Sequence, residues 1–132
     1  MGPVVVDASI VVAALSAADP LHRPAVRALR DVEHRRIAAS VITYAEVLVG
    51  ARRRGAVAVS YAESFFDEAL DELGDVTVEV ARRAAAMRAE HRALGLPDAI
   101  VLATAELTGA DRVLTGDARW RSVSSLVQVI AT

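Results

Sequence analysis

The chain contains neither cysteine nor lysine. The absence of cysteine excludes disulfides, zinc–thiolate sites and a cysteine nucleophile. Because all 15 basic residues are arginine, the chain also lacks the lysine that P-loop NTPases, Schiff-base enzymes and receiver domains require. These absences remove several competing classes of phosphate and carbonyl chemistry.

Long apolar runs are also missing, although 54% of the residues are hydrophobic. No uninterrupted run approaches the roughly 18 residues of a membrane-spanning helix. Asp7 interrupts the only apolar candidate for a signal peptide near the N-terminus. We therefore expect a soluble, cytoplasmic protein with no membrane partner.

The length of 132 residues suits one domain spanning residues 1–132. Strand-like and helix-like segments alternate, which predicts an α/β domain with a mainly parallel central sheet flanked by helices. Predicted strands cover residues 3–7, 36–39, 75–78, 112–115 and 127–130. Predicted helices cover residues 9–17, 23–35, 42–54, 57–73, 79–94 and 97–108.

Four acidic residues stand in or beside apolar segments: Asp7, Glu46, Asp98 and Asp117. Asp7 and Asp117 each come at the end of a predicted strand. Glu46 has apolar or small neighbours three and four residues away, so its side of the helix is not expected to be a solvated face. Asp98 follows Pro97 at the start of a helix that is apolar almost all round and therefore expected to be buried.

Each acid also has an ordinary structural interpretation. Asp7 suits a helix N-cap, and Asp98 a first-turn acid that complements the helix dipole. Asp117 suits a turn after Gly116. Glu46 could extend to solvent or pair with an arginine. Taken singly, Asp7, Asp98 and Asp117 favour these interpretations.

Taken together, the four acids predict one site. In parallel α/β sheets ligands bind beyond the carboxyl ends of the strands, where two strand-end acids and two helical acids can meet. Two carboxylates about 4 Å apart repel by roughly 4 kcal/mol at an effective dielectric near 20, so four ionised carboxylates need a cation. Oxygen ligands without cysteine favour Mg²⁺ or Mn²⁺.

The same motifs resemble those of the PIN-domain ribonucleases, and among them the VapC-type toxins of prokaryotic toxin–antitoxin systems. The resemblance covers essentially the whole chain. It rests on four segments in order, namely Val5-Val6-Asp7-Ala8-Ser9, Ser40-Val41-Ile42-Thr43-Tyr44-Ala45-Glu46-Val47, Leu96-Pro97-Asp98-Ala99-Ile100-Val101-Leu102-Ala103-Thr104-Ala105 and Leu114-Thr115-Gly116-Asp117. No single segment is specific, but their order and spacing are, and none of the acids is replaced.

This resemblance implies an Mg²⁺- or Mn²⁺-dependent endoribonuclease, the toxin of a type II system, that is typically a homodimer and is held inactive by a cognate antitoxin. Asp7, Glu46 and Asp98 would bind the principal ion and Asp117 would complete the site. Ser9 and Thr115 would orient the carboxylates. Helices near residues 23–35 and 42–73 offer apolar surface for the antitoxin.

Two other functions remain open from the sequence. One is a PIN-like nuclease that acts on DNA or in RNA processing. The other is a non-catalytic domain whose acids are caps and whose groove binds a protein.

Several basic and aromatic residues are candidates for the RNA interface. Arg119 and Arg121 follow Asp117 and are weaker candidates for substrate binding. The arginines at residues 52–54 are either part of a phosphate track or complement a helix dipole. Trp120 could stack on a base but more often such a residue packs in the core. The histidines lack ligand spacing and are expected at the surface or as caps: His22, His34 and His91.

Overall fold

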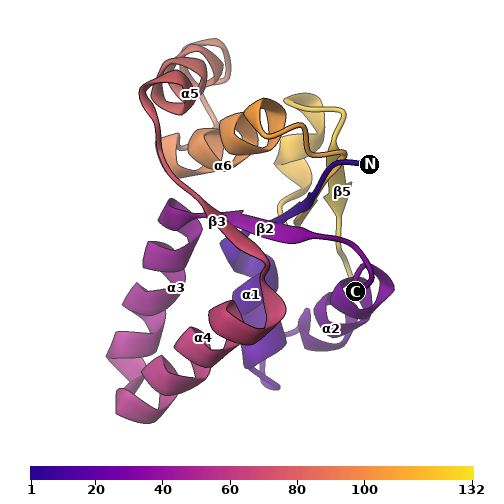
Figure 1. Ribbon diagram of the computed structural model, residues 1–132, viewed down its shortest axis with the longest axis vertical. Helices are drawn as coiled ribbons and strands as arrows, with labels where there is room; N and C mark the ends of the chain where they lie inside the picture. The colour runs from indigo at the N-terminus through magenta and orange to yellow at the C-terminus, as the bar shows by residue number, and fades with distance from the viewer.

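Five parallel strands run through the centre of the structure, a computed structural model that describes residues 1–132 (Figure 1). The strand order is β3-β2-β1-β4-β5, and all four neighbouring pairs are parallel. The strands are β1 (Val4–Val6), β2 (Ile37–Ser40), β3 (Glu72–Gly74), β4 (Arg112–Thr115) and β5 (Val127–Val129). The expectation of an α/β domain with a mainly parallel sheet is confirmed.

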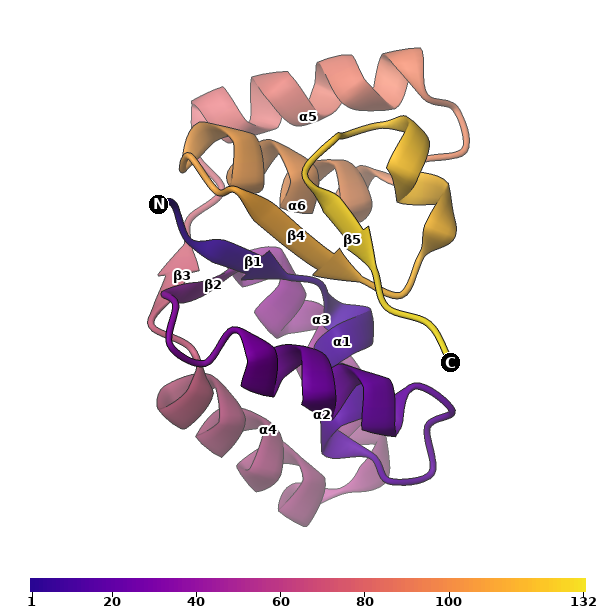
Figure 2. The ribbon, with the colours of Figure 1, turned by 90° about the vertical axis from the view of Figure 1, so that its right-hand side faces the viewer.

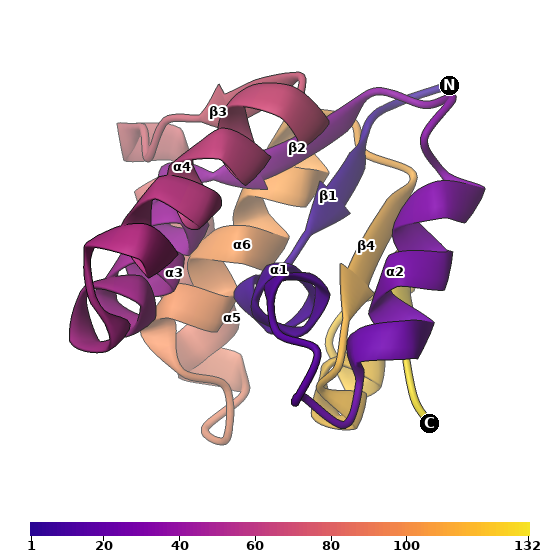
Figure 3. The same cartoon turned by 90° about the horizontal axis from the view of Figure 1, so that it is seen from below.

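Helices cover both faces of the sheet. They are α1 (Ala8–Leu15), α2 (His22–Asp31), α3 (Val41–Arg54), α4 (Ala56–Ala69), α5 (Val78–Glu90), α6 (Leu96–Leu107) and the short 3₁₀ helix η1 (Ala118–Ser122). Figure 2 shows α5 and α6 above the strands and α2 and α4 below them. Seen from below, in Figure 3, α1 lies between α2 on one side and α3 with α4 on the other.

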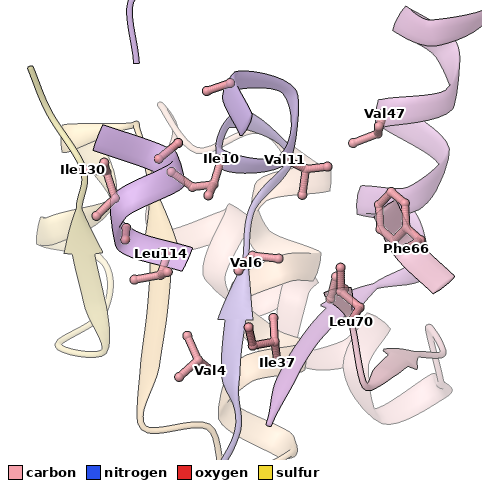
Figure 4. Close-up of a cluster of buried hydrophobic side chains, with 14 of the residues drawn as sticks. Val4, Val6, Ile10, Val11, Ile37, Val47, Phe66, Leu70, Leu114 and Ile130 are labelled. Atoms are coloured by element: carbon pink, nitrogen blue, oxygen red, sulfur yellow. The ribbon is translucent and has the colours of Figure 1, made fainter. Parts of the chain in front are cut away.

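The two faces of the central strand belong to two separate hydrophobic clusters. Val4 and Val6 point into the cluster with α1 to α4, whereas Val5 points into the cluster with α5 and α6. This alternation is the two-residue period of a strand, and all three valines are fully buried. Figure 4 shows Val4 and Val6 with Ile10, Phe66 and other members of the first cluster. A strand buried on both faces explains the continuous apolar run in the sequence.

The connection between α4 and α5 differs from the prediction. A helix was expected over residues 57–73 and a strand over 75–78, but α4 ends at Ala69 and β3 occupies Glu72–Gly74. The side chain of Thr77 accepts a hydrogen bond from the Val80 backbone N–H and so begins α5. Residues 77 and 78 therefore cannot continue a strand, in spite of their β-branched side chains.

Two other helices end a full turn earlier than predicted, and one element was not predicted. The helix expected over 23–35 ends at Asp31, and the one expected over 79–94 ends at Glu90. The 3₁₀ helix η1 follows Asp117, whose side chain caps it by accepting from the Arg119 backbone N–H. No helix has the length and apolar character required to cross a membrane.

Candidate functional site

The four acids lie around the carboxyl ends of β1 and β4, which are neighbours in the sheet. After β1 the chain continues to β2 on one side, and after β4 it continues to β5 on the other side, so the strand order reverses between β1 and β4. The arrows of β1 and β4 point the same way in Figure 2. Asp7 directly follows β1, and its backbone N–H donates to Leu114 of β4 at 3.0 Å. Asp117 comes two residues after β4. This is the position where parallel α/β sheets form ligand crevices.

Asp7 is buried, with 6% of its surface exposed. It stands at the N-cap position of α1, but its side chain makes no capping hydrogen bond. Instead, its Oδ2 accepts hydrogen bonds from Ser9 Oγ at 2.7 Å and Thr115 Oγ1 at 2.9 Å. Both donors bind the same oxygen, which fixes the carboxylate while Oδ1 makes no protein hydrogen bond.

The two hydroxyl groups also join the strand ends to each other. Ser9 Oγ accepts from the Gly116 backbone N–H at 2.9 Å, and Thr115 Oγ1 accepts from the Asp117 backbone N–H at 3.1 Å. A Cβ on Gly116 would lie 2.8 Å from a methyl of Leu21 and 3.4 Å from Ser9 Oγ. Since residue 116 has no side chain, the loop after β4 can pack closely against Leu21 and Ser9.

Asp98 lies in the first turn of α6 and is half-buried. The burial of α6 predicted from its apolar residues is confirmed. Burial raises the pKa of Asp98, and the negative charges of Asp7 and Asp117 raise it further, against smaller opposing effects of Arg119 and Trp120. The Trp120 indole N–H lies near enough to Asp98 to favour its charged form. The two groups do not meet the geometry of a hydrogen bond, and the indole N–H has no other hydrogen-bond partner.

Glu46 is an exposed residue of α3, contrary to the expectation from its neighbours. Val49 and Gly50, which flank it on the helix, are exposed as well, because this side of α3 faces an open part of the surface rather than the core. Its carboxyl group is still partly shielded from water. This shielding raises the pKa of Glu46, followed by repulsion from Asp7 and Asp98. Glu46 forms none of the ion pairs with arginine.

Asp117 already has a cationic partner. The Arg119 side chain donates to both of its carboxylate oxygens, with Nη2 at 2.7 Å from Oδ2 and Nε at 3.0 Å from Oδ1. These hydrogen bonds lower the pKa of Asp117. Arg119 and Arg121 are both exposed on η1, and the pairing with Asp117 keeps the Arg119 charge beside the acids. The sequence showed that Arg119 is close to Asp117 but not that it pairs with it.

The electrostatics link all four acids into one group, here called the acidic cluster (Asp7, Glu46, Asp98 and Asp117). Glu46 is repelled by Asp7 and Asp98, and Asp98 by Asp7 and Asp117. No three of the acidic or histidine side chains are arranged to hold an ion together as they stand. The oxygen donors and their mutual repulsion nevertheless suit a hard divalent cation, which would require some of these side chains to turn inward.

The fold and the acidic cluster together define a parallel α/β protein with an anionic crevice at the switch point of its sheet. The PIN domain family model matches residues 4–126. The chain therefore belongs to the PIN domain family, as its motifs predicted.

Solved structures of toxin–antitoxin proteins have the same fold. A toxin–antitoxin complex from Klebsiella pneumoniae is 27% identical, with 96% of each chain covered and a TM-score of 0.80. VapC20 from Mycobacterium tuberculosis, described as a sarcin–ricin loop cleaving toxin, is 21% identical over 97% of this chain and 99% of that chain, with a TM-score of 0.81. VapBC2 from Rickettsia felis, bound to promoter DNA, is 17% identical over 97% and 98%, with a TM-score of 0.80. Among curated proteins, no sequence relative matches the chain.

Proposed function

We propose that this chain is a divalent-metal-dependent endoribonuclease and the toxin of a type II toxin–antitoxin pair in the cytoplasm of a prokaryote. The observation that carries the proposal is the acidic cluster, whose members repel one another at the carboxyl edge of a PIN-domain sheet. Proteins of this family are nucleases, and the VapC20 structure with the same fold is described as a sarcin–ricin loop cleaving toxin.

The residues that would hold Mg²⁺ or Mn²⁺ are Asp7, Glu46 and Asp98, with Asp117 completing the site. When bound there, a divalent ion stabilises negative charge on the phosphate and makes water a stronger nucleophile at neutral pH. Attack by water on phosphorus, with departure of the 3′-oxygen, leaves 5′-phosphate and 3′-hydroxyl ends. The RNA 2′-hydroxyl takes no part in this reaction.

The neighbouring residues have supporting tasks. Ser9 and Thr115 hold the Asp7 carboxylate in one orientation, because both donate to the same oxygen. Arg119 pairs with Asp117 in the absence of a divalent ion and would release it when an ion or a phosphate arrives. Arg119 and Arg121 would then contact RNA phosphates, since arginine binds phosphate well through its planar group of donors.

An apolar groove on α3 and α4 is the proposed docking surface for the antitoxin. This groove has a volume of about 440 Å³. Val57 and Tyr61 both line this groove and are 72% and 69% exposed, and contiguous exposed apolar surface is typical of protein-interaction sites. Phe66, which is also on α4, is buried in the core and is not part of this surface. The structural neighbours that contain toxin–antitoxin complexes support such a partner, and the family resemblance alone supports a homodimer.

Cleavage of total cellular RNA tests the proposed function. The purified chain, free of any partner, is incubated with RNA in Mg²⁺ or Mn²⁺, and the new 5′ ends are sequenced. We expect discrete cuts with 5′-phosphate ends that are absent in EDTA and absent with Asp98→Asn. Products with 2′,3′-cyclic phosphates, or cuts that persist in EDTA, would contradict the mechanism. Cleavage of DNA but not RNA would favour the alternative nuclease.

A further inference from the structure

A second feature lies beside the acidic cluster, and Glu46 is not part of it. It is a cavity of about 340 Å³ between η1 and the loop that joins α5 to α6. Its wall includes Asp98 and Asp117, so the cavity opens directly onto the cluster. The other polar residues of the wall are His91, Arg92, Arg119 and Ser122. A volume of this size is at the lower end of the range of small-molecule sites, roughly 300–1,000 Å³.

Basic side chains also line the cavity. Arg92 comes from the loop between α5 and α6 and Arg119 from η1, and His91 precedes Arg92 in the chain. Arg119 is engaged with Asp117, but Arg92 takes part in none of the four ion pairs of the chain. An arginine without an ion-pair partner can bind a phosphate. Because Arg92 stands beside the acids, this phosphate would be a neighbour of the one that reacts at the acidic cluster.

The remaining wall is apolar and contains a donor without a partner. Leu94, Trp120 and Val123 form this wall. Trp120 is 2% exposed, and its indole N–H makes no hydrogen bond. A buried donor without an acceptor is uncommon in proteins, and this one lies close enough to Asp98 to favour its charged form. Stacking of a base directly on Trp120 is excluded by its burial, so its ring belongs to the wall of the cavity.

The walls are held by the core. Leu94 is buried in the cluster of α5 and α6, and its backbone N–H donates to His91 at 3.0 Å. The His91 backbone N–H in turn donates to Met87 of α5 at 2.9 Å. The backbone that carries Arg92 is therefore fixed on both sides, so no rearrangement of this turn is needed before a ligand binds.

We propose that this cavity binds one nucleotide of the RNA chain, next to the phosphate that is cleaved. The base enters against the apolar wall, and Arg92 with His91 binds the phosphate of that nucleotide. This inference rests on the proposed function, because it assigns part of the substrate to a position beside the same acids. It makes Arg92 a substrate-binding residue and the α5–α6 loop a determinant of which nucleotide precedes or follows the cut.

Fluorescence of Trp120 offers a direct test because it is the only tryptophan and lines the cavity. A single-stranded oligoribonucleotide is titrated into the protein in EDTA, where no cleavage occurs. We expect a saturable change in Trp120 emission. Arg92→Gln should weaken binding about tenfold, as expected for the loss of a charge-assisted hydrogen bond, and should reduce the slope of log affinity against log salt by about 0.7.

Arg88→Gln is the matched control. Arg88 is an exposed arginine one turn earlier on α5 and does not line the cavity. This variant should bind RNA within about twofold of the unmodified chain, since an exposed charge outside the contact contributes little. Equal losses in Arg88→Gln and Arg92→Gln would overturn the proposal, because they would indicate general attraction of RNA to α5.

Steady-state cleavage separates failure of this proposal from failure of the proposed function. Arg92→Gln should raise KM with little change in kcat, because Arg92 does not contact the reacting atoms. If the chain cuts RNA but Arg92→Gln behaves like the unmodified protein, the nucleotide cavity is wrong and the nuclease stands. If an acidic peptide, but no RNA, binds with the same dependence on Arg92, the cavity is a protein-docking site and the nucleotide assignment is wrong.

Discussion

Asp7 has the most constrained surroundings of the four acids. A buried carboxylate needs hydrogen-bond donors, and Asp7 has two, namely Ser9 in α1 and Thr115 at the end of β4. Neither bond is a helix cap, although the position of Asp7 is that of an N-cap. The carboxylate is thus held by the surrounding side chains and not used to stabilise α1.

Thr115→Val should weaken both the fold and the site. The substitution keeps the shape but removes a donor to Asp7 and an acceptor for the Asp117 backbone N–H. We expect the free energy of unfolding to fall by about 1–3 kcal/mol, as measured by denaturant titration, together with weaker Mn²⁺ binding. Thr104→Val is the control, since Thr104 is also buried but donates to Ile100 within α6. Equal Mn²⁺ affinities in the two variants would contradict the role of Thr115.

Asp98→Asn should abolish cleavage without unfolding the protein. Burial and the charges of Asp7 and Asp117 disfavour the charged form of Asp98, so a neutral side chain of the same shape relieves repulsion. We expect a Tm equal to or above that of the unmodified chain, measured without divalent ions. A marked fall in Tm would show that Asp98 is ionised for structural reasons.

The raised pKa values of Glu46 and Asp98 predict a pH dependence of stability. Each folded-state pKa lies above its ordinary value of 4.5 or 3.8, so the folded chain binds more protons than the unfolded chain in that window. These two groups therefore stabilise the folded chain at pH values below their ordinary pKa values. This stabilisation is lost as the pH rises through their raised folded-state pKa values. Asp117 has a lowered pKa, so it stabilises the folded chain above its ordinary pKa of 3.8, and this stabilisation is lost as the pH falls through the lowered value.

Unfolding measured against pH in EDTA checks this sign. We expect the double variant Glu46→Gln and Asp98→Asn to gain stability relative to the unmodified chain as pH rises through the raised pKa values of the two groups. Saturating Mg²⁺ should remove most of this difference by stabilising the unmodified chain, because an ion that binds only the folded state shifts the equilibrium toward it. A difference that is independent of pH would contradict the repulsion.

At the scale of elements, β1 and β4 bring together residues that are more than a hundred positions apart in the chain. Their parallel register pairs Val6 with Leu114 and so places Asp7 beside the turn that carries Asp117. The apolar runs and the acids that end them predicted strand-end acids at one edge of a parallel sheet, but not that β1 and β4 are neighbours in it. The exposure of Glu46 was not predictable from its neighbours, because helical spacing shows which residues share a face but not whether another element covers that face.

The pairing of β3 was also beyond the sequence. Glu72 and Leu73 are exposed on an edge strand, where little side-chain packing marks a strand. Their helix-forming side chains favoured an extension of α4. The Arg119–Asp117 pair depends likewise on the turn into η1, which no hydrophobic period indicates.

The groove on α3 and α4 yields a prediction at this scale. Val57→Asp places a charge on a side chain that is 72% exposed, so the Tm should change little. Binding to the cognate antitoxin should be lost, because a carboxylate would be buried without a partner in the interface. Co-purification of the two chains measures this, and RNA cleavage by the isolated variant should be unchanged. Retained binding would locate the antitoxin elsewhere.

For the whole molecule, the net charge of −2 matters less than where the charges lie. The acids gather at one edge of the sheet, and Arg92 and Arg119 lie beside Asp98 and Asp117. A divalent ion would cancel the remaining negative charge there and so remove the repulsion of a polyanion from this edge. Composition alone could not reveal this, since it gives the sum of the charges but not their positions.

Titration of Mn²⁺ by calorimetry tests the central claim, that the acidic cluster is one metal site. The comparison is between Glu46→Gln and Glu63→Gln, which remove the same charge from exposed glutamates on α3 and α4. We predict saturable binding to the unmodified chain, unchanged binding to Glu63→Gln, and a loss of about tenfold or more with Glu46→Gln, since a carboxylate ligand is removed. Equal Mn²⁺ affinity in both variants, or no saturable binding to the folded unmodified chain, would contradict the account.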